Sequence, residues 1–252
     1  MKIPLFKTLA VFSITGALAC SAHATTLVQY LNSTSASFTS TANVVDPLLT
    51  SAGAFTLPTS LAVNTDTGFS TAGSPSTRNA YLRTDHVAAD ETAALALSGR
   101  YYSFTLTPGS TPVKFETMTF GLGTSANTAV VASETANAFL RSSLDNFTST
   151  IGTSAGISNV TVPNPASLWP TTIVSQSISF GASFSHVTQP VTFRLYLTDT
   201  LNNNQVALRL TNLQITGAAA IPESSTSALA ASGMIGLFTV AFRRRRTSRS
   251  SE

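Results

Sequence analysis

Short apolar alternations with a period of two are the feature that most restricts the fold of this chain. In Tyr102–Leu106 three apolar residues alternate with Ser103 and Thr105, and Pro108-Gly109 then turns the chain. The same period runs through Val191–Leu197. Such alternation places one row of side chains on the buried face of a strand. A parallel α/β fold would need helices of about ten to fifteen residues between its strands, and these are missing, so we expect antiparallel strands.

Further strands are predicted where apolar segments lie between clusters of Gly, Pro, Asn and Ser, which supply the turns. Four such segments are Leu27–Leu31, Lys114–Leu122, Ile157–Val162 and Ile173–Phe180. In Val206–Ile215 the apolar set changes parity between Leu210 and Leu213, which predicts a β-bulge.

Little of the middle of the chain has a helical pattern. Ala88–Leu97 is rich in Ala and could form one or two helical turns, and the Thr/Ser-rich Thr59–Thr77 is expected to be a long surface loop. These patterns together predict an all-β fold for residues 25–220, an antiparallel two-sheet β-sandwich with one apolar face on each sheet.

Composition excludes several classes of function. Between residues 25 and 222, Thr and Ser account for 59 of 198 residues, and seven Lys and Arg stand against nine Asp and Glu, a net charge of −2. Nucleic-acid binding requires a basic face that displaces phosphate counterions, so we expect no nucleic-acid partner. Cys20 is the sole cysteine and lies near the N-terminus. The remaining chain therefore lacks a disulfide, a sulfur ligand for zinc and a thiol nucleophile.

The first 24 residues have the pattern of a secretory signal. Lys2 and Lys7 precede the apolar run Thr8–Ala19, and Ala22-His23-Ala24 follows it. Small residues at Ala22 and Ala24 form an A-x-A site, which predicts cleavage by signal peptidase after Ala24. The run is shorter than the ~20 residues of a spanning helix. A lipoprotein site at Cys20 is the alternative, although the leucine before it stands one position out of place.

Residues 221–252 form a second targeting segment. A short motif, Ile221–Thr226, is followed by the apolar stretch Ala228–Phe242 and by the cluster Arg243, Arg244, Arg245 and Arg246. Arginines at this position stop transfer and remain on the cytoplasmic side. The apolar stretch would form a helix of about 22 Å, less than the ~30 Å hydrocarbon core, which suits transient rather than permanent anchoring. An ordinary tail anchor is the alternative.

This tail resembles the PEP-CTERM sorting signal, which combines a Pro-Glu-Pro motif, a hydrophobic helix and an Arg cluster. Pro222 and Glu223 match the first two motif residues, while Ser224 replaces the second proline. The resemblance implies that an exosortase, a membrane cysteine protease-transpeptidase, recognises the motif. It also implies transient anchoring in the inner membrane and delivery to the cell surface or an extracellular matrix. The precursor would then carry a hydrophobic helix at each end.

The middle of the chain is similar to the globular part of many PEP-CTERM proteins. The segments that carry this resemblance are Arg141–Phe147, which reads RSSLDNF, the strand Val191–Tyr196, and Leu210–Gly217. The resemblance implies a jelly-roll-like sandwich and no agreed enzyme activity.

Catalytic motifs are weak throughout. Ser154 lies in a G-x-S-x-G pattern, but the mechanism needs a helix after the serine, and a β-branched segment follows instead. His86 could pair with Asp85, although a solvated turn is the simpler interpretation. Gly121-Leu122-Gly123 lacks the third glycine and the helix of a nucleotide-binding loop.

Carboxylates are sparse as well. Glu116 and Glu134 are the formal candidates for a glycosidase pair, with Glu116 expected to face solvent. Asp145-Asn146 and Asp199–Asn204 are rich in oxygen and could bind calcium, but ordinary Asx turns explain both segments better. We therefore expect no metal and no catalytic residue.

Aromatic residues offer the last indication of a ligand. Sugar-binding sandwiches often stack pyranose rings on exposed aromatic side chains. Trp169, in a Pro-flanked loop, and Tyr196 are the candidates for carbohydrate contact, and Tyr101 is a further one. Packing of Trp169 against the core is the simpler interpretation.

The sequence therefore predicts an exported surface or matrix protein with a structural or interaction role, no enzymatic activity and no cofactor. Its expected partners are signal peptidase and exosortase during processing. A lectin-like module that binds exopolysaccharide is the alternative, and a hydrolase ranks third.

Overall fold

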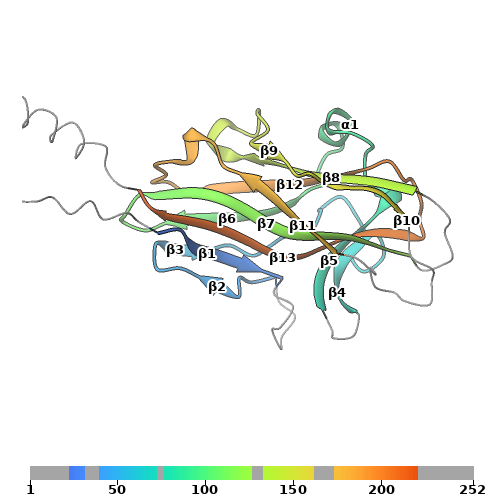
Figure 1. The fold of residues 1–252 in the computed structure, drawn as a ribbon, viewed down its shortest axis with the longest axis horizontal. Coiled ribbons are helices and arrows are strands. Elements are labelled where there is room, and N and C mark those ends of the chain that lie inside the picture. Colours follow the sequence, from blue (N-terminus) through green and yellow to red (C-terminus); the bar gives the residue numbers. More distant parts are fainter. Residues whose placement is uncertain (1–22, 32–39, 73–76, 127–132, 162–172, 221–252) are drawn as a thin grey trace, which may run out of the picture.

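The computed structural model describes residues 23–31, 40–72, 77–126, 133–161 and 173–220, and these form two β-sheets packed face to face (Figure 1). Within the described residues the first sheet, sheet A, contains seven strands. In spatial order they are β11 (Ile173–Ser179), β7 (Val113–Ala126), β13 (Val206–Ala219), β1 (Thr25–Tyr30) and β2 (Val44–Val45), with β5 (Thr77–Arg83) also paired to β13 and β4 (Thr67–Ala72) paired to β5.

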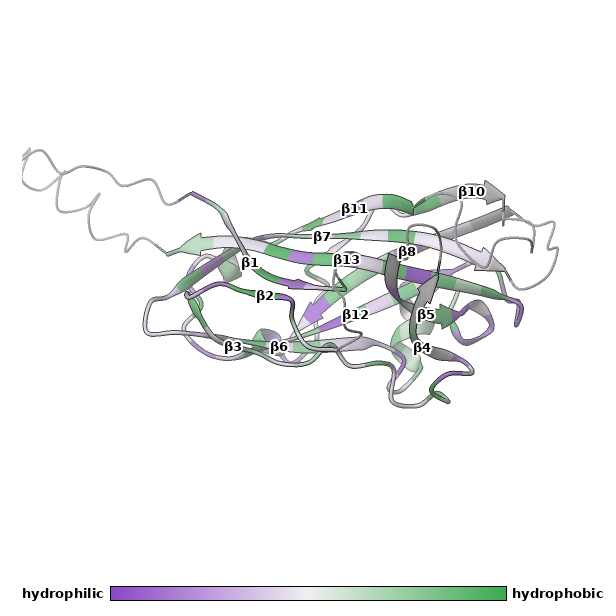
Figure 2. Ribbon diagram, turned by 90° about the horizontal axis from the view of Figure 1, so that it is seen from below, coloured by the Kyte–Doolittle hydropathy of each residue, from purple (hydrophilic) through white to green (hydrophobic). Residues whose placement is uncertain are grey.

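Sheet B contains six strands in the described parts of the chain. Their order is β10 (Ile157–Thr161), β8 (Ser133–Ser142), β12 (Val191–Asp199), β6 (Tyr102–Pro108) and β3 (Leu49–Ala52), with β9 (Gly152–Thr153) paired to β8. The ladders that join the named strands are antiparallel, and Figure 2 shows β7 and β13 in one layer with β3 and β6 in the other. The predicted two-sheet β-sandwich is therefore confirmed, while the predicted terminal helices fall outside the described residues.

Strand β13 changes partner at the predicted β-bulge. Its register with β7 shifts between Thr211 and Gln214, and Asn212 between them has a φ of 55°. On its other edge, Ala207–Leu210 pairs with β5, whereas the part from Leu213 onward pairs with β1. The bulge therefore lies where the second neighbour of β13 changes, which confirms the parity switch in the sequence and gives it a structural reason.

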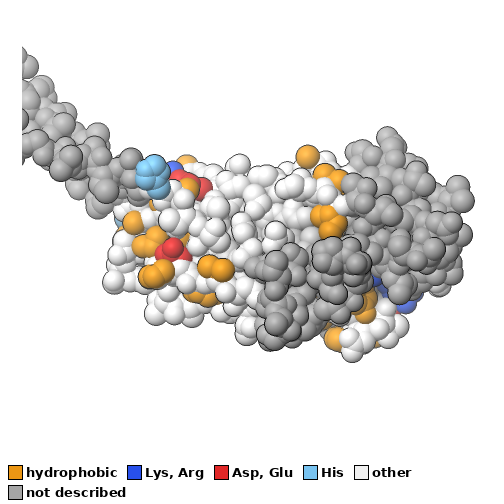
Figure 3. Space-filling view, turned by 60° about the horizontal axis from the view of Figure 1, so that its bottom comes forward, with side chains coloured by type: hydrophobic (Ala, Val, Ile, Leu, Met, Phe, Trp, Pro, Cys, Tyr) orange, Lys and Arg blue, Asp and Glu red, His pale blue; other side chains and the backbone are white. Residues whose placement is uncertain are grey.

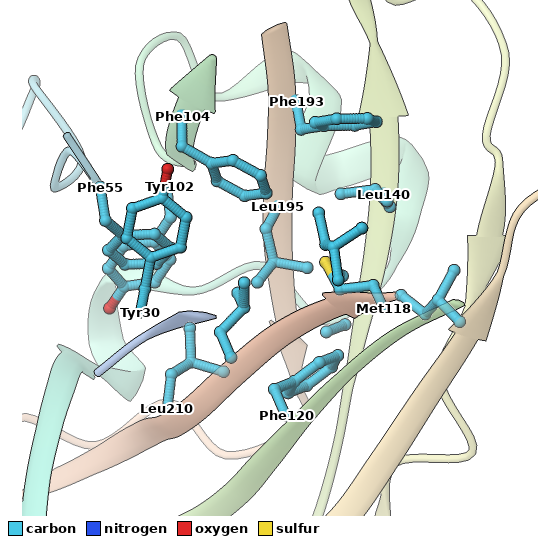
Figure 4. Close-up of a cluster of buried hydrophobic side chains, with 14 of the residues drawn as sticks. Tyr30, Phe55, Tyr102, Phe104, Met118, Phe120, Leu140, Phe193, Leu195 and Leu210 are labelled. Atoms are coloured by element: carbon cyan, nitrogen blue, oxygen red, sulfur yellow. The ribbon is translucent and has the colours of Figure 1, made fainter. Parts of the chain in front are cut away.

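Aromatic side chains from both sheets fill the space between them (Figure 4). The ring of Tyr30 on β1 lies 5.3 Å from that of Phe104 on β6, and Phe104 lies 5.4 Å from Phe193 on β12. The Tyr30 hydroxyl donates a 2.6 Å hydrogen bond to the carbonyl of Gly53, so its polar end is satisfied within the core. Burial of each such side chain stabilises the fold by roughly 1.5–3 kcal/mol.

The single α-helix among the described residues, α1 (Glu91–Ala96), covers part of the outer face of sheet B. Asp90 caps it, because its side chain accepts a 2.8 Å hydrogen bond from the N–H of Ala93. Ala94 then packs against Phe139 of β8 and Tyr196 of β12. The one or two helical turns predicted for Ala88–Leu97 are confirmed. Over the ranges that the structure describes, we find no helix with the length and apolar character needed to cross a membrane.

The prediction of a surface loop over Thr59–Thr77 is confirmed for residues 59–66, which form mostly exposed turns, but is wrong for Thr67–Ala72. Strand β4 lies within this segment and pairs with β5 along its whole length. Phe69 is the one large apolar side chain of β4. A strand that pairs only with β5 needs little apolar surface, so its sequence has the composition of a loop.

Strand β8 was not predicted, because apolar side chains are buried on both of its faces. Ala136, Ala138 and Leu140 face the core between the sheets, while Phe139 is buried on the other side beneath α1. A strand covered on both faces loses the apolar–polar alternation by which strands are recognised.

Gln176 links the two sheets at the edge formed by β11 and β9. Its side chain accepts a 2.7 Å hydrogen bond from the N–H of Gly156 and donates one of 3.1 Å to the carbonyl of the same residue. Gly156 has a φ of 74°, and a Cβ atom there would lie 2.4 Å from the carbonyl oxygen of Ala136. Only glycine therefore fits at this position.

This geometry predicts that two glycine substitutions differ in their effect on the free energy of unfolding. Gly156→Ala should destabilise the protein by at least about 2 kcal/mol, because a positive φ and a close backbone contact are both penalised. Gly181→Ala is the matched control, since its φ is −82° and a Cβ would meet nothing within 4 Å. Urea unfolding would measure both variants, and equal stability of the two would contradict the account.

Candidate functional site

Two of the three segments that carry the family resemblance, Arg141–Phe147 and Val191–Tyr196, meet on the outer face of sheet B, whereas Leu210–Gly217 lies in β13 of sheet A. Arg194 of β12 lies between two aromatic rings, with its guanidinium carbon 4.5 Å from the ring centre of Tyr101 and 3.6 Å from that of Phe147. A cation over an aromatic face is attracted by the electron density of the ring. Arg194 thereby connects the strand motif to the loop that follows β8.

Arg141 of β8 fixes that loop in place. Its guanidinium donates hydrogen bonds to the carbonyls of Phe147 at 2.8 Å and Thr148 at 3.0 Å, and to the hydroxyl of Thr150 at 3.2 Å. It also forms a 3.1 Å ion pair with Glu91 at the start of α1, and the same Glu91 oxygen accepts a hydrogen bond from Thr150. The rigid fork of an arginine suits such a set of acceptors.

Asp145 holds the loop from within, through contacts three and four residues on rather than the predicted Asx turn, which would bind the N–H two residues on. The carboxylate accepts hydrogen bonds from the N–H of Ser149 at 2.8 Å and the hydroxyl of Thr148 at 3.2 Å. Burial raises the pKa of Asp145, but these hydrogen bonds outweigh it and hold the pKa below its usual value. Asn146 and Phe147 both have positive φ, and Phe147 is thereby directed onto Arg194. The motif thus has a structural role.

Tyr196 is not available for stacking on a sugar. It is only 5% exposed, and its ring lies parallel to that of Phe139 at a centroid distance of 4.7 Å. Tyr101 packs against it at 5.2 Å. The other predicted carbohydrate contact, Trp169, lies outside the described residues.

A group of charged side chains lies at the end of the sandwich farthest from the N-terminus of β1. Arg83 forms ion pairs with Asp66 at 3.1 Å and with Asp85 at 2.8 Å, and His86 lies 3.2 Å from Asp66 and 3.8 Å from Asp85. Burial raises the pKa of Asp66, but the Ala62 N–H and the neighbouring His86 and Arg83 lower it below its usual value. His86 does lie in a turn, but a partly buried one in which its partner is mainly Asp66.

Other catalytic candidates also have structural partners. The Ser154 hydroxyl is buried and accepts a 3.1 Å hydrogen bond from the N–H of Ala138, and strand β10 follows it. Glu116 of sheet A forms a 2.8 Å ion pair with Lys114, whereas Glu134 belongs to a strand of sheet B. Ser154 therefore binds backbone and Glu116 binds a lysine, as residues with structural roles do.

The oxygen-rich segment at Asp199 is also a turn. Its carboxylate accepts a 2.8 Å hydrogen bond from the N–H of Leu201, two residues on, which is the predicted Asx geometry. In the ranges covered by the structure, no group of three or more His, Cys, Asp or Glu residues is arranged to hold a metal ion.

The solvent face of sheet A contains a groove that the sequence did not predict. It has a volume of about 280 Å³ and lies over β11, β7 and β13, which are neighbours in Figure 1. Gly121 forms its floor, and the residues around it are uncharged. Gly121 and Gly123 occur two positions apart and therefore on one face of β7. The spacing of these two glycines was the only sign of the groove in the sequence. The pairing of β7 with β11 and β13 is needed to show that side chains from both neighbouring strands surround Gly121.

No protein-family model and no curated protein matches the sequence. Similar solved structures include the K3 cleaved adhesin domain of Lys-gingipain from Porphyromonas gingivalis, with 18% identity, 58% of this chain and 77% of that chain covered, and a TM-score of 0.33. A Stig cyclase from Fischerella sp. TAU has 12% identity, coverage of 82% and 93%, and a TM-score of 0.29. The CBM22-1–GH10 modules of xylanase 10B from Clostridium thermocellum have 12% identity, coverage of 60% and 24%, and a TM-score of 0.30. We draw no functional conclusion from similarities this low.

The contacts of Arg141 predict that lysine cannot replace it. Arg141→Lys keeps the charge but loses the fork that joins three oxygens of the loop to Glu91, and should lower the free energy of unfolding by about 1–3 kcal/mol. Lys114→Ala is the control, because that side chain is 50% exposed and its ion pair should contribute less than about 1 kcal/mol. Chemical denaturation would measure both. An Arg141→Lys variant as stable as wild type would show that the loop does not depend on Arg141.

Proposed function

We propose that this chain is exported and held at the cell surface or in an extracellular matrix, where its β-sandwich acts as a non-catalytic interaction domain. The observation that carries this proposal is the pairing of the first and last strands. Thr25 at the start of β1 lies opposite Gly217 near the end of β13. Both connections to the rest of the chain therefore leave from the same end of the sandwich, at the left of Figure 1.

The limits of the folded strands fit two processing events. Strand β1 begins at Thr25, directly after the A-x-A site that ends at Ala24. At the other end, β13 finishes at Ala219 and Ala220 is still buried, directly before the sorting motif at Pro222 and Glu223. Cleavage after Ala24 and at the motif would therefore remove both targeting segments without cutting a strand.

An interaction role suits what the polar residues singled out in the sequence do. Ser154, a possible nucleophile, Asp145, a possible calcium ligand, and Arg141 of the resemblance segment each use their polar atoms to hold the backbone of neighbouring segments. On the face drawn in Figure 3, few of the described side chains are coloured as Lys, Arg, Asp or Glu. Such a surface is suited to a neutral partner more than to a strongly charged one.

The second candidate function is that of a lectin-like protein: a jelly-roll-like module that binds the exopolysaccharide of the cell. The uncharged groove over Gly121 favours it. Trp169 remains a sequence-based candidate for stacking on a sugar ring.

The proposal predicts the mass of the protein recovered from the surface fraction of its host. Intact-mass and terminal-peptide mass spectrometry should find a chain that begins at Thr25 and ends near Pro222 or Glu223. A chain that retains Arg243–Arg246 would contradict exosortase sorting and indicate a tail-anchored protein in which Ser224 has impaired the motif. A lipid-modified Cys20 at the N-terminus would contradict the predicted signal cleavage.

A further inference from the structure

We propose that the groove over Gly121 on the solvent face of sheet A binds a neutral sugar ring of a polysaccharide. This inference rests on the proposed function, since it names the partner of an exported interaction domain. The sequence analysis did not predict a site at this position.

The groove arises from the strand register. Ser175 of β11, Gly121 of β7 and Thr211 of β13 are direct neighbours across the three strands. Side chains in such a row point to the same side of a sheet. Because the central residue of the row is glycine, the surface of the sheet is lower between Ser175 and Thr211, and neighbouring methyl groups fill only its bottom.

Apolar groups form the bottom of this gap. The Cβ atom of a residue larger than glycine at position 121 would lie 2.5 Å from Cγ2 of Ile173 and 2.7 Å from Cγ2 of Thr211. The two methyl groups therefore lean over Gly121 from either side. The C–H face of a pyranose ring is also apolar, and a shallow floor of methyl groups is complementary to it.

Hydroxyl and amide groups form the rim. In the next row along the strands Thr119 lies beside Gln214, and both line the groove, as do Asn212 and Ser175. Hydroxyls and amides both donate and accept hydrogen bonds, as do the hydroxyl groups of a sugar. The residues that line the groove include no Lys, Arg, Asp or Glu, so an anion would find no countercharge there.

Thr211 provides independent evidence for a ligand. It is only 4% exposed, it lines the groove, and its hydroxyl has no hydrogen-bond partner among the described residues. A buried hydroxyl without a partner is costly, and it is a rare feature of folded proteins. Rotation of the side chain by about 120° about the Cα–Cβ bond would bring the hydroxyl to the position that the methyl group holds over Gly121, where a bound sugar could supply the missing partner.

The test measures binding of the full-length protein, purified from its host, to the exopolysaccharide of that host and to its neutral oligosaccharide fragments. Ser175→Trp places a large side chain at the rim of the groove. Ser179→Trp is the matched control, because it lies on the same strand and the same face but does not line the groove. Gln214→Ala removes an amide from the rim and adds no bulk.

We expect Ser179→Trp to bind like wild type, and Ser175→Trp and Gln214→Ala to bind the neutral fragments at least about tenfold more weakly, which corresponds to about 1.4 kcal/mol. Circular dichroism would verify that each variant is folded, and Gln214→Ala remains informative if the tryptophan variants are not. Equal binding by all variants, or no binding of neutral fragments by wild type, would overturn the proposal.

Failure of this inference and failure of the proposed function give different results. A correctly processed chain that binds no neutral fragment would overturn the sugar site alone. A chain that retains its tail would contradict the proposed exosortase sorting, whatever the binding measurement gives.

Discussion

Strand β13 holds sheet A together, because each of the other parts of that sheet is joined to it. One edge of β13 pairs with β7 from Val206 to Ala219, and the opposite edge pairs first with β5 and then with β1. Without β13 the sheet would divide into three unconnected pieces: β11 with β7, β1 with β2, and β4 with β5. The bulge at Asn212 makes the double pairing possible, since the strand changes its second neighbour there.

This arrangement links folding to the order of the chain. Most contacts of sheet A join segments far apart in sequence, and the closure of long loops precedes the gain from pairing. The last described strand ends directly before the segment that resembles a sorting tail. A chain that crosses a membrane from its N-terminus would therefore complete sheet A only when the tail arrives, so the proposed order of export, folding and sorting is physically consistent.

Local patterns predicted the features that depend on local sequence. The alternations in Tyr102–Leu106 and Val191–Leu197 correspond to β6 and β12, and the parity change in β13 corresponds to a bulge. Prediction failed where tertiary neighbours decide the outcome. Phe139 and Tyr196 are buried by α1, so an outward-facing aromatic residue did not indicate a free surface. The groove required the register of three strands, which no single segment contains.

The central claim is that β13 is required for the sandwich to form, and a truncation tests it most directly. Residues 25–220 and residues 25–205 would be compared by thermal unfolding and by amide hydrogen exchange in β7. The longer chain should unfold in one cooperative transition with protected β7 amides, whereas the shorter chain should show neither. A peptide of residues 206–220 added to the shorter chain should restore both. Cooperative unfolding and protected β7 amides in residues 25–205 alone would contradict the account.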